Sequence, residues 1–339
     1  GRTIKNLIMH IFGMQKNMAH SSLASIFEES VKKLPLSDEY IITDSIDTFF
    51  EKIQGKYDVL IVGSDAVWNW TLRGFPNPYF LNKERLSPIK MSYAASSYGQ
   101  EYFGLSDDKK IYIRQAWRDF KYLGVRDKAT EDFVAFVDSS LNTSHNCDPT
   151  VLLEMDSLHN YVDGVKKKLM EQGVDFSKPV VGIMGLDDLG ALVRDVVGEE
   201  TQIVAVFRKN SFANFYLGEI SPFEWSVAFS LFSVTFTHFF HGNLLSLKNG
   251  TPTIIIEHAS EYNKRHNSKI RDLMGRLDLL NHCFYMEDFN LTKARELYDE
   301  IILDNKQIIS SKIERALSIE ASSYDDFYNH LNKFIGRSA

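Results

Sequence analysis

The stretch from Val234 to Ile256 constrains the fold of this chain more than any other part of the sequence. It reads as a strand up to about Thr237, an abrupt turn, a short helix that begins near His241-Gly242, a Gly-Thr-Pro turn and a second strand over 253–256. A strand–helix–strand unit belongs to an α/β sheet, and ligands bind where its first strand ends and its helix begins. Backbone N–H groups at a helix start attract anions, Gly242 allows close approach to the backbone, and His241 can donate a proton. We therefore expect this point to bind a phosphate or a carboxylate.

A simpler interpretation of the same residues is structural. His241 would cap a helix and Gly242 would make a turn, which is sufficient to explain a single His-Gly pair. The pair stands at the C-terminal end of a strand, however, and a second histidine, His238, lies three residues earlier. This position favours the ligand interpretation.

The remainder of the chain repeats short buried strands that end in polar residues. Strands are predicted over 57–62, 90–95, 121–125, 180–184, 202–207 and 283–286, and helices over 44–53, 107–120, 129–137, 155–172, 189–197, 269–277, 291–317 and 324–334. Ser221 and Glu224 form a capping-box pattern at a further helix start. The pattern predicts an α/β fold of two doubly wound domains that face each other across a cleft. We expect the first domain over 1–154, joined by a C-terminal helix over 320–339, and the second over 155–319.

Composition excludes several classes of function. The chain has 339 residues and a formal net charge of −7, which argues against non-specific binding of nucleic acid. Its two cysteines, Cys147 and Cys283, lie far apart, which excludes a cysteine-rich zinc site and suits a reducing cytosol. Phosphate-loop, dinucleotide, serine-hydrolase and metalloprotease motifs are absent from the sequence, and Asp187-Asp188 is interpreted as a surface acid pair. With no signal peptide and no membrane-spanning segment in the sequence, we expect a cytoplasmic protein without a metal or cofactor.

Charged and polar side chains gather at the predicted strand ends. They are Asp65, Ser96, Arg126, Arg208, Lys209 and His241, followed in one polar loop by Arg265, Asn267 and Lys269. Several cations near a helix start indicate a small, strongly anionic ligand, because arginine binds carboxylate or phosphate through paired hydrogen bonds. Structural alternatives exist: Arg126 could pair locally with Asp127, and for Arg208 and Lys209 we favour solvated side chains. Trp68 is either a core residue or a platform for a sugar ring.

Taken in order, these segments resemble the polysaccharide pyruvyl transferase family. The matching segments are 57–69 (YDVLIVGSDAVWN), 92–96 (SYAAS), 125–127 (VRD), 148–150 (DPT), 237–242 (THFFHG) and 249–252 (NGTP), with a looser match at 267–270 (NSKI). The resemblance implies two Rossmann-like halves similar to the GT-B glycosyltransferases. It also implies transfer of the enolpyruvyl carbons of phosphoenolpyruvate to two hydroxyls of one sugar, as a cyclic ketal, with release of phosphate.

The chain departs from this family in two places. Many members carry an arginine two residues before the histidine that corresponds to His241, and here that position is Phe239. A strand and loop containing Gly and Asn, which precede the first matching segment in the family, are not found in this sequence. We expect that their absence would remove part of the donor or acceptor pocket.

The resemblance and the strand-end residues together assign expected roles. We expect Arg126 and His241 to bind the two anionic groups of phosphoenolpyruvate, His241 to protonate the departing phosphate, and Asp65 to act as base for the sugar hydroxyl. Further substrate contacts are expected from Gly63, Ser64, Trp68, Ser96, Gly242, Asn267 and Lys269. The expected partners are phosphoenolpyruvate and a sugar or lipid-linked acceptor, met at the inner face of the membrane during capsule or exopolysaccharide assembly.

Two other functions are open at this point. Glu257, which follows the strand 253–256, would suit the ribose of a nucleotide sugar in a GT-B glycosyltransferase. The other is a catalytically silent sugar-binding relative, for which Phe239 and the missing first segment are the support.

Overall fold

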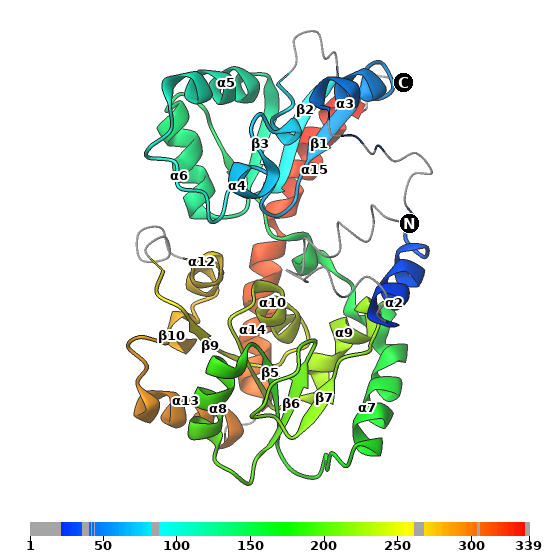
Figure 1. Cartoon of the computed structure of the whole chain (residues 1–339), viewed down its shortest axis with the longest axis vertical. Helices are drawn as coiled ribbons and strands as arrows, with labels where there is room; N and C mark the ends of the chain where they lie inside the picture. Colours follow the sequence, from blue (N-terminus) through cyan, green and yellow to red (C-terminus); the bar gives the residue numbers. More distant parts are fainter. Residues whose placement is uncertain are drawn as a thin grey trace. The chain divides into compact units, whose positions relative to one another are not determined.

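The structure is a computed structural model that describes residues 22–35, 41, 43, 45–82, 88–260, 268–303 and 306–335. These residues form two compact units, each built on its own parallel sheet (Figure 1). Unit 1 takes the described residues before Thr43, Glu154–His258 and Asn281–Arg315, whereas unit 2 takes Thr43–Leu153, Ala259–Leu280 and Ala316–Ala339. Of the described residues, those before Thr43 group with unit 1, and 259–260 and 268–280 group with unit 2, whereas we expected them in the other domain. Unit 2 also takes the chain from Ala316, where position 320 was expected.

Unit 2 is built on a four-stranded parallel sheet in the order β1-β2-β3-β4. Its strands are β1 (Val59–Val62), β2 (Ile89–Ala95), β3 (Phe120–Val125) and β4 (Ser144–His145). Its helices are α3 (Ile46–Ile53), α4 (Trp70–Arg73), η2 (Pro78–Phe80), α5 (Asp107–Arg118), α6 (Lys128–Val137), η3 (Pro149–Leu152), α12 (Lys269–Arg276) and α15 (Ser323–Ile335). The described strands follow one another in chain order, so the reversal of winding predicted for this domain is not seen among them.

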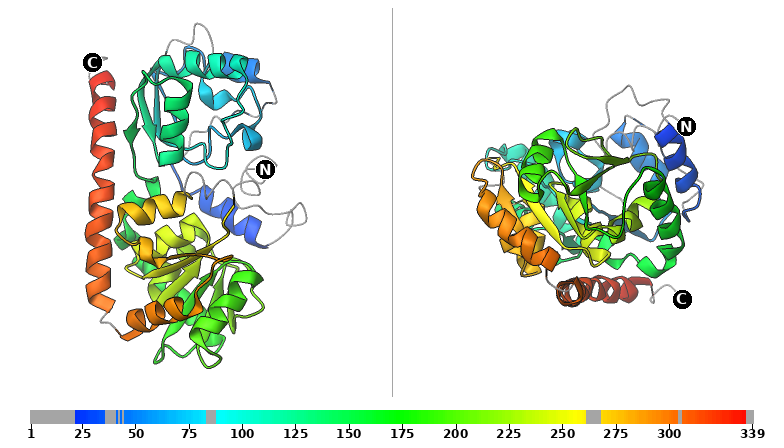
Figure 2. Two further views of the ribbon diagram at one scale, coloured as in Figure 1. Left: turned by 90° about the vertical axis from the view of Figure 1, so that its left-hand side faces the viewer. Right: turned by 90° about the horizontal axis from the view of Figure 1, so that it is seen from below.

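Aromatic side chains form the core of unit 2. The indole of Trp68 is fully buried, and its ring centroid lies 4.9 Å from that of Trp117 and 6.3 Å from that of Phe80. A second cluster joins Met91 and Tyr122 of the sheet to Phe327 of α15, the red helix at the C-terminus in Figure 2. Large rings bury enough apolar surface to stabilise a sheet of only four strands.

Unit 1 is built on a six-stranded parallel sheet in the order β10-β9-β8-β5-β6-β7. Its strands are β5 (Val180–Met184), β6 (Gln202–Val206), β7 (Phe215–Leu217), β8 (Val234–Thr237), β9 (Thr253–Glu257) and β10 (Cys283–Tyr285). Strands β5 to β7 run outward in one direction and β8 to β10 in the other, so the doubly wound arrangement is confirmed for this unit. The winding reverses between β5 and β8, which is where such sheets bind ligands beyond the C-terminal ends of the strands.

The core of unit 1 follows from alternating apolar residues on these strands. Val181, Phe236 and Ile254 pack with Leu189 of α8 (Asp187–Val197) and Leu297 of α13 (Leu291–Leu303). The helices of the unit are α2 (Ser22–Val31), η4 (Met155–Tyr161), α7 (Val162–Glu171), α8 (Asp187–Val197), α9 (Pro222–Ala228), η5 (Phe229–Leu231), α10 (Phe240–Lys248), η6 (Leu280–His282) and α13 (Leu291–Leu303). The division into units falls within η6 and within α14 (Lys306–Ala321).

Local structure departs from the sequence prediction in strand β7 and in two of the long helices, among other places. The three-residue strand β7 was not predicted, the helix expected over 155–172 begins as the 3-10 turn η4, and the helix expected over 291–317 is divided between α13 and α14. The predicted capping box is confirmed, since Ser221 and Glu224 exchange hydrogen bonds at the start of α9.

Candidate functional site

The C-terminal ends of the unit 2 strands lie side by side along one edge of the sheet. Asp65 pairs as a bridge with Ala95, the N–H of Arg126 donates to the Ala95 carbonyl (3.1 Å), and the N–H of Asn146 donates to that of Val125 (2.8 Å). The polar residues that follow β1, β2, β3 and β4 are therefore neighbours, as parallel strands require.

Gly63 is the residue that makes the turn after β1 possible. Its φ is +150°, and a Cβ at this position would lie 1.9 Å from the carbonyl oxygen of Tyr93. Ser64 is half-buried beside it, and Asp65 takes a left-handed backbone conformation with φ of 65°. A strained backbone of this kind is typical of residues held for function.

Arg126 is the centre of the polar cluster in unit 2. Its side chain is 2% exposed, with Nη2 donating to Asp65 Oδ1 (2.7 Å) and Nη1 to Asp148 Oδ2 (2.5 Å). Burial alone would lower the pKa of Arg126, but the carboxylates of Asp148 and Asp65 outweigh it and hold the pKa above its ordinary value. Because both terminal nitrogens bind carboxylates, the geometry makes Arg126 the residue that positions Asp65. This differs from the expectation that Arg126 binds an anionic group of phosphoenolpyruvate.

Asp127 does not form the local ion pair that was considered for Arg126. Its carboxylate caps α6 by accepting from the N–H and hydroxyl of Thr130, and it also accepts from the hydroxyl of Ser96 (2.5 Å). Ser96 itself is fully buried, so its expected contact with substrate is corrected to a role in holding Asp127.

Asp65 is the accessible carboxylate of the cluster. Its side chain is 39% exposed, against 5% for Asp148. The ammonium of Lys269 lies 3.4 Å from Asp65 Oδ1 and 5.2 Å from the ring centroid of Tyr98. Burial and the nearby charge of Arg126 lower the pKa of Lys269 below its ordinary value, and they outweigh Asp65, which raises it. The result is a half-open carboxylate beside two cations, an arrangement suited to a base or to an anionic ligand beside Lys269.

Trp68 is a core residue, which confirms one of its two interpretations and corrects the expected contact with substrate. Its indole is fully buried and its Nε1 donates to the carbonyl of Tyr79 (3.2 Å), so it cannot stack on a sugar ring in this structure. Asn267 and Arg265, also singled out from the sequence, lie outside the described residues.

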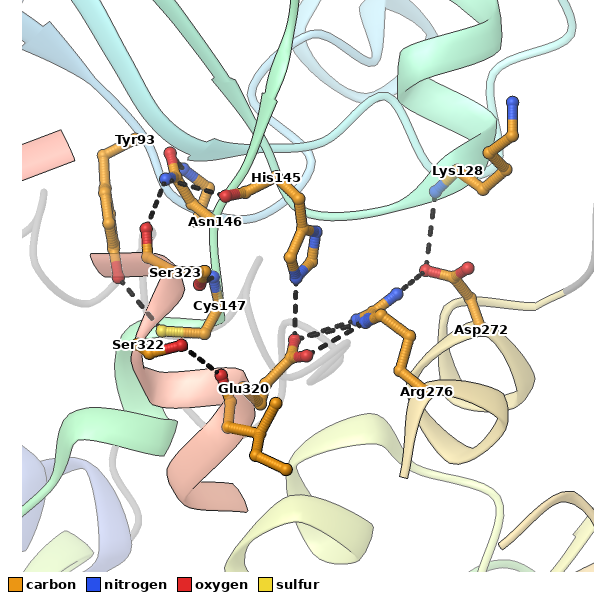
Figure 3. A network of polar contacts seen from close by, with 12 residues as sticks. Tyr93, Lys128, His145, Asn146, Cys147, Asp272, Arg276, Glu320, Ser322 and Ser323 are labelled. Atoms are coloured by element: carbon orange, nitrogen blue, oxygen red, sulfur yellow. Dashed lines mark hydrogen bonds and ion pairs between the residues drawn. The ribbon is translucent and has the colours of Figure 1, made fainter. Parts of the chain in front are cut away.

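The helix that carries Lys269, α12, is fastened to unit 2 by a polar network (Figure 3). Arg276 donates to the carboxylate of Glu320 (3.1 Å) and pairs with Asp272 (2.5 Å), and Glu320 also contacts Nε2 of His145 (2.9 Å). Burial alone would raise the pKa of Glu320, but His145 and Arg276 outweigh it and lower the pKa to about 2. The network fixes α12, and with it Lys269, against the sheet.

The second candidate group lies in unit 1 at the reversal of winding. Thr237 ends β8; its hydroxyl donates to the Met184 carbonyl at the end of β5 (2.8 Å) and accepts from the N–H of Phe239 (2.9 Å). His241 is half-buried in the first turn of α10, and that turn contains no acidic residue. The predicted helix start thus lies at the predicted place, and an anion is electrostatically favoured there.

Gly242 has a packing reason that the sequence did not suggest. It is buried, and a Cβ there would lie 2.7 Å from Met184 Sδ and 2.9 Å from Thr237 Oγ1. The glycine therefore lets α10 begin close against β5 and β8, and the expected approach of a ligand to its backbone stays a prediction.

His238 and His258 lie in the same part of unit 1. The imidazole of His258 lies 3.1 Å from Asp188 and 3.3 Å from Glu287, and these bonds raise its pKa. Burial lowers the pKa of His238, and the charges of His258 and Arg208 lower it further, whereas the charge of Asp188 raises it. The buried Nδ1 of His238 has no hydrogen-bond partner among the described residues. No three His, Cys, Asp or Glu side chains in the described ranges could together hold a metal ion.

The side chain of Arg208 is less exposed than the solvated side chain that we favoured from the sequence. It is half-buried, and its guanidinium lies 5.6 Å from the ring centroid of Phe239, directly before α10. Lys209 is exposed, as expected. In the part of the chain that the structure describes, no helix has the length and apolar character to cross a bilayer.

Comparisons with known proteins agree with this architecture. The model of the family described as polysaccharide pyruvyl transferase matches residues 14–260. A comparison with curated proteins found no match. Among solved structures, a protein of Listeria monocytogenes assigned as a UDP-N-acetylglucosamine 2-epimerase is similar, with TM-score 0.53, 12% identity, and coverage of 88% of this chain and 83% of that one. The UDP-GlcNAc 2-epimerase of Neisseria meningitidis bound to UDP-GlcNAc gives TM-score 0.52, 11% identity and coverage of 87% and 84%. The fold is α/β with two Rossmann-like parts, of the GT-B-like kind.

Proposed function

Because the chain belongs to the polysaccharide pyruvyl transferase family, we propose that it transfers the enolpyruvyl group of phosphoenolpyruvate to two hydroxyls of one sugar. The product is a cyclic ketal and the leaving group is phosphate. The acceptor we propose is a sugar or lipid-linked oligosaccharide of capsule or exopolysaccharide assembly, at the cytoplasmic face of the membrane. No cofactor takes part in this scheme.

The observation that carries the proposal is the environment of Asp65. It is the carboxylate of the cluster that reaches solvent, and it is held by Arg126 at 2.7 Å and by Lys269 at 3.4 Å. A fixed carboxylate is the group needed to take the proton of an attacking hydroxyl, and the ammonium of Lys269 beside it suits an anionic donor.

The proposed reaction exchanges one phosphate for two sugar oxygens at C2 of the donor. A proton adds to the methylene carbon, and the first hydroxyl attacks the cation that forms at C2 and loses its own proton. The C2–O bond to phosphate then breaks, its electron pair leaves on phosphate, and the second hydroxyl attacks the same carbon. The two hydroxyl protons balance the proton added to carbon and the proton taken by phosphate.

In this scheme Asp65 is the base for the hydroxyls and Arg126 keeps it in position. His241, at the start of α10, binds the phosphate together with the helix N–H groups and protonates its bridging oxygen as it leaves. The location of His241 in the first turn of the helix, without an acidic neighbour in that turn, supports this role.

A nucleotide-sugar glycosyltransferase is the second candidate. It is supported by the similar fold of the Neisseria epimerase, which is bound to UDP-GlcNAc. Glu257, the residue considered for a ribose, is only 4% exposed at the end of β9, which leaves little room for such a contact. A silent sugar-binding relative is the third candidate, and it would bind sugar without responding to phosphoenolpyruvate.

The test is mass spectrometry of candidate glycans incubated with phosphoenolpyruvate and the full chain. The expected product carries the mass of pyruvate less one water, with one phosphate released for each ketal formed. Transfer of a sugar from UDP-GlcNAc, with no phosphate released from phosphoenolpyruvate, would establish the second candidate instead. Calorimetric titration with phosphoenolpyruvate separates the silent relative, which gives no heat.

A further inference from the structure

Unit 2 contains a half-buried arginine that has no carboxylate partner. Arg73 is the last residue of α4, the short helix in the connection that leaves the carboxyl end of β1. Its buried Nε has no hydrogen-bond partner, and its guanidinium makes neither an ion pair nor a hydrogen bond to any residue that the structure describes. Burying a donor without a partner costs free energy, and such donors in folded proteins usually bind a ligand, an ion or water. The guanidinium is therefore able to accept an anionic group.

An aromatic ring supports this guanidinium in place of a carboxylate. The Cζ atom of Arg73 lies 5.9 Å from the ring centroid of Tyr79, which is within the range of a cation–π contact. Tyr79 is 38% exposed, so the pair meets solvent. A guanidinium that lies on an aromatic ring keeps its N–H edge for paired hydrogen bonds, the geometry in which arginine binds a carboxylate or a phosphate.

Buried side chains fix the backbone on both sides of the pair. The fully buried amide of Asn77 accepts from the N–H of Tyr79 (3.0 Å), and the indole Nε1 of Trp68 donates to the carbonyl of Tyr79 (3.2 Å). The N–H of Arg73 donates to the carbonyl of Asn69, the buried N-cap of α4 (3.0 Å). Because the backbone positions of both residues are already set, little order has to be created when a ligand binds.

Helix α4 is joined to the residues around the proposed base. Asn69 Nδ2 donates to the carbonyl of Tyr98 (2.8 Å). The ring centroid of Tyr98 lies 5.2 Å from the ammonium of Lys269, which lies 3.4 Å from Asp65 Oδ1. Arg73 is one helical turn beyond Asn69. It therefore lies at the same carboxyl edge of the unit 2 sheet as Asp65, outside the cluster of charges that holds that carboxylate.

We propose that Arg73 binds an anionic group of the acceptor, a carboxylate or a phosphate, with Tyr79 supporting its guanidinium. The inference rests on the proposed function and deepens it, because it makes the acceptor an acidic substrate. The charged group would be either an acidic sugar of the glycan or the phosphate that links it to a carrier. A cation at the carboxyl edge of the sheet, apart from the base, suits a charged group near the hydroxyls that react. A neutral glycan would leave this guanidinium unpaired.

The experiment compares four full-length proteins: wild type, Arg73→Met, Arg73→Lys and Arg118→Met. Arg118 is the matched control, because it is an exposed arginine of the same unit that pairs with Asp138 (2.8 Å), and its loss changes the net charge equally. Trigalacturonate, maltotriose, inorganic pyrophosphate and phosphoenolpyruvate are titrated into each protein by calorimetry, and the unfolding temperature of each is recorded. Trigalacturonate carries carboxylates, maltotriose is a neutral glycan of the same length, and pyrophosphate represents a phosphate carrier.

We expect wild type to bind at least one of the two acidic probes, and to bind it more tightly than maltotriose. Arg73→Met should weaken that binding about 10- to 100-fold, the range for charge-assisted hydrogen bonds. Arg73→Lys keeps the charge but not the paired geometry, so it should retain part of the affinity. Arg118→Met should retain all of it, and the affinity for phosphoenolpyruvate should not change in any variant.

The source of the anion follows from the probe that is lost. A loss confined to trigalacturonate identifies an acidic sugar, and a loss confined to pyrophosphate identifies the phosphate of a carrier. The inference is overturned if wild type binds neither acidic probe, if it binds maltotriose as tightly, or if Arg73→Met binds the acidic probes like wild type. An equal loss in Arg118→Met would reduce the effect to net charge. If Arg73→Met does not fold, Arg73→Lys decides, since undiminished affinity there excludes paired hydrogen bonds.

The titration with phosphoenolpyruvate separates this inference from the proposed function. If an acidic probe binds through Arg73 but phosphoenolpyruvate gives no heat and no ketal forms, the anion site stands and the pyruvyl transfer falls. If Arg73→Met weakens phosphoenolpyruvate by the same factor as the acidic probes, Arg73 is a ligand of the donor and its assignment to the acceptor falls.

Discussion

The guanidinium of Arg126, at the end of β3, donates a 2.7 Å hydrogen bond to the carboxylate of Asp65, which follows β1 on the other side of β2. The same guanidinium binds Asp148 after β4, so one buried cation ties together the ends of three strands. Arg126 is therefore held in place, with its positive charge balanced by two carboxylates, whereas the side chain of Asp65 remains half-exposed. The first two predictions test the role of Asp65 in the reaction and the role of Arg126 in stability.

Replacing Asp65 with asparagine should remove activity while the fold is retained. An amide keeps the shape of the carboxylate but cannot take the proton of an attacking hydroxyl, so we expect phosphate release to fall about 10²- to 10⁴-fold. The measurement is the rate of phosphate release at saturating phosphoenolpyruvate and acceptor. Asp156→Asn is the control, because that side chain is fully exposed. A rate for Asp65→Asn equal to that of the control would remove Asp65 from the mechanism.

Replacing Arg126 with methionine should damage stability as well as activity. The change leaves Asp148, which is 5% exposed, without its buried cation. Breaking a buried ion pair in this way costs about 3–5 kcal/mol, so the unfolding temperature should fall by several degrees. The double variant Arg126→Met/Asp148→Asn should recover part of that loss, because no unpaired carboxylate is then buried at position 148. An unfolding temperature equal to wild type in the single variant would show that the pairing contributes nothing.

The general arrangement could be predicted from the sequence because apolar runs such as 57–62 and Val180–Met184 have strand length and are followed by Gly or polar residues. Residues at the strand ends were found for the same reason. What the sequence could not give was the direction of each side chain: Trp68 and Ser96 follow strands just as Asp65 does, yet both are buried. Burial depends on partners that are distant in the chain.

The same limit explains the larger misses. β7 contains three residues, too few for a pattern of alternation to be recognised. Helix α12 follows the last long strand of unit 1 in sequence but groups with unit 2, because Arg276 and Asp272 bind residues there. Arg208 was interpreted as solvated because nothing in its neighbourhood in the sequence indicates Phe239 as its partner.

Replacing His241 with alanine should abolish phosphate release and leave the unfolding temperature unchanged. The imidazole is half-buried at the start of α10, where its loss removes a proton donor and a phosphate contact without opening the core. We expect the rate of phosphate release to fall about 10²- to 10⁴-fold, as for loss of a general acid. His159→Ala, at a side chain 72% exposed, serves as the matched control. Equal turnover by both variants would exclude His241 as the acid.

Glu320 should make stability depend on pH in the acid range. Its pKa is about 2 in the folded protein against 4.5 in its ordinary state, because His145 and Arg276 outweigh the effect of burial. A carboxyl with a lowered pKa contributes its full stability above pH 4.5 and loses it as the pH falls towards 2. Glu320→Gln should therefore lower the free energy of unfolding at pH 7 by roughly 3 kcal/mol, and the difference from wild type should shrink between pH 5 and pH 2. Urea unfolding at pH 7, 5 and 3 measures it, and a difference that does not change with pH would contradict it.

Substitution of Gly242 tests why a glycine stands at the start of α10. The reason is either close packing of the helix or the approach of a ligand to the backbone. A Cβ there would lie 2.7 Å from Met184 Sδ and 2.9 Å from Thr237 Oγ1, so Gly242→Ala should push α10 away from β5 and β8 and lower both stability and activity. If packing is the reason, Gly242→Ala/Met184→Ala should recover part of the phosphate release lost in the single variant, because the shortened side chain makes room for the methyl group. Recovery is partial at best, since Thr237 stays and Met184 is itself a buried residue. If the glycine instead lets the donor reach the backbone, the double variant will be as inactive as Gly242→Ala, and affinity for phosphoenolpyruvate, measured by calorimetry, will fall in both.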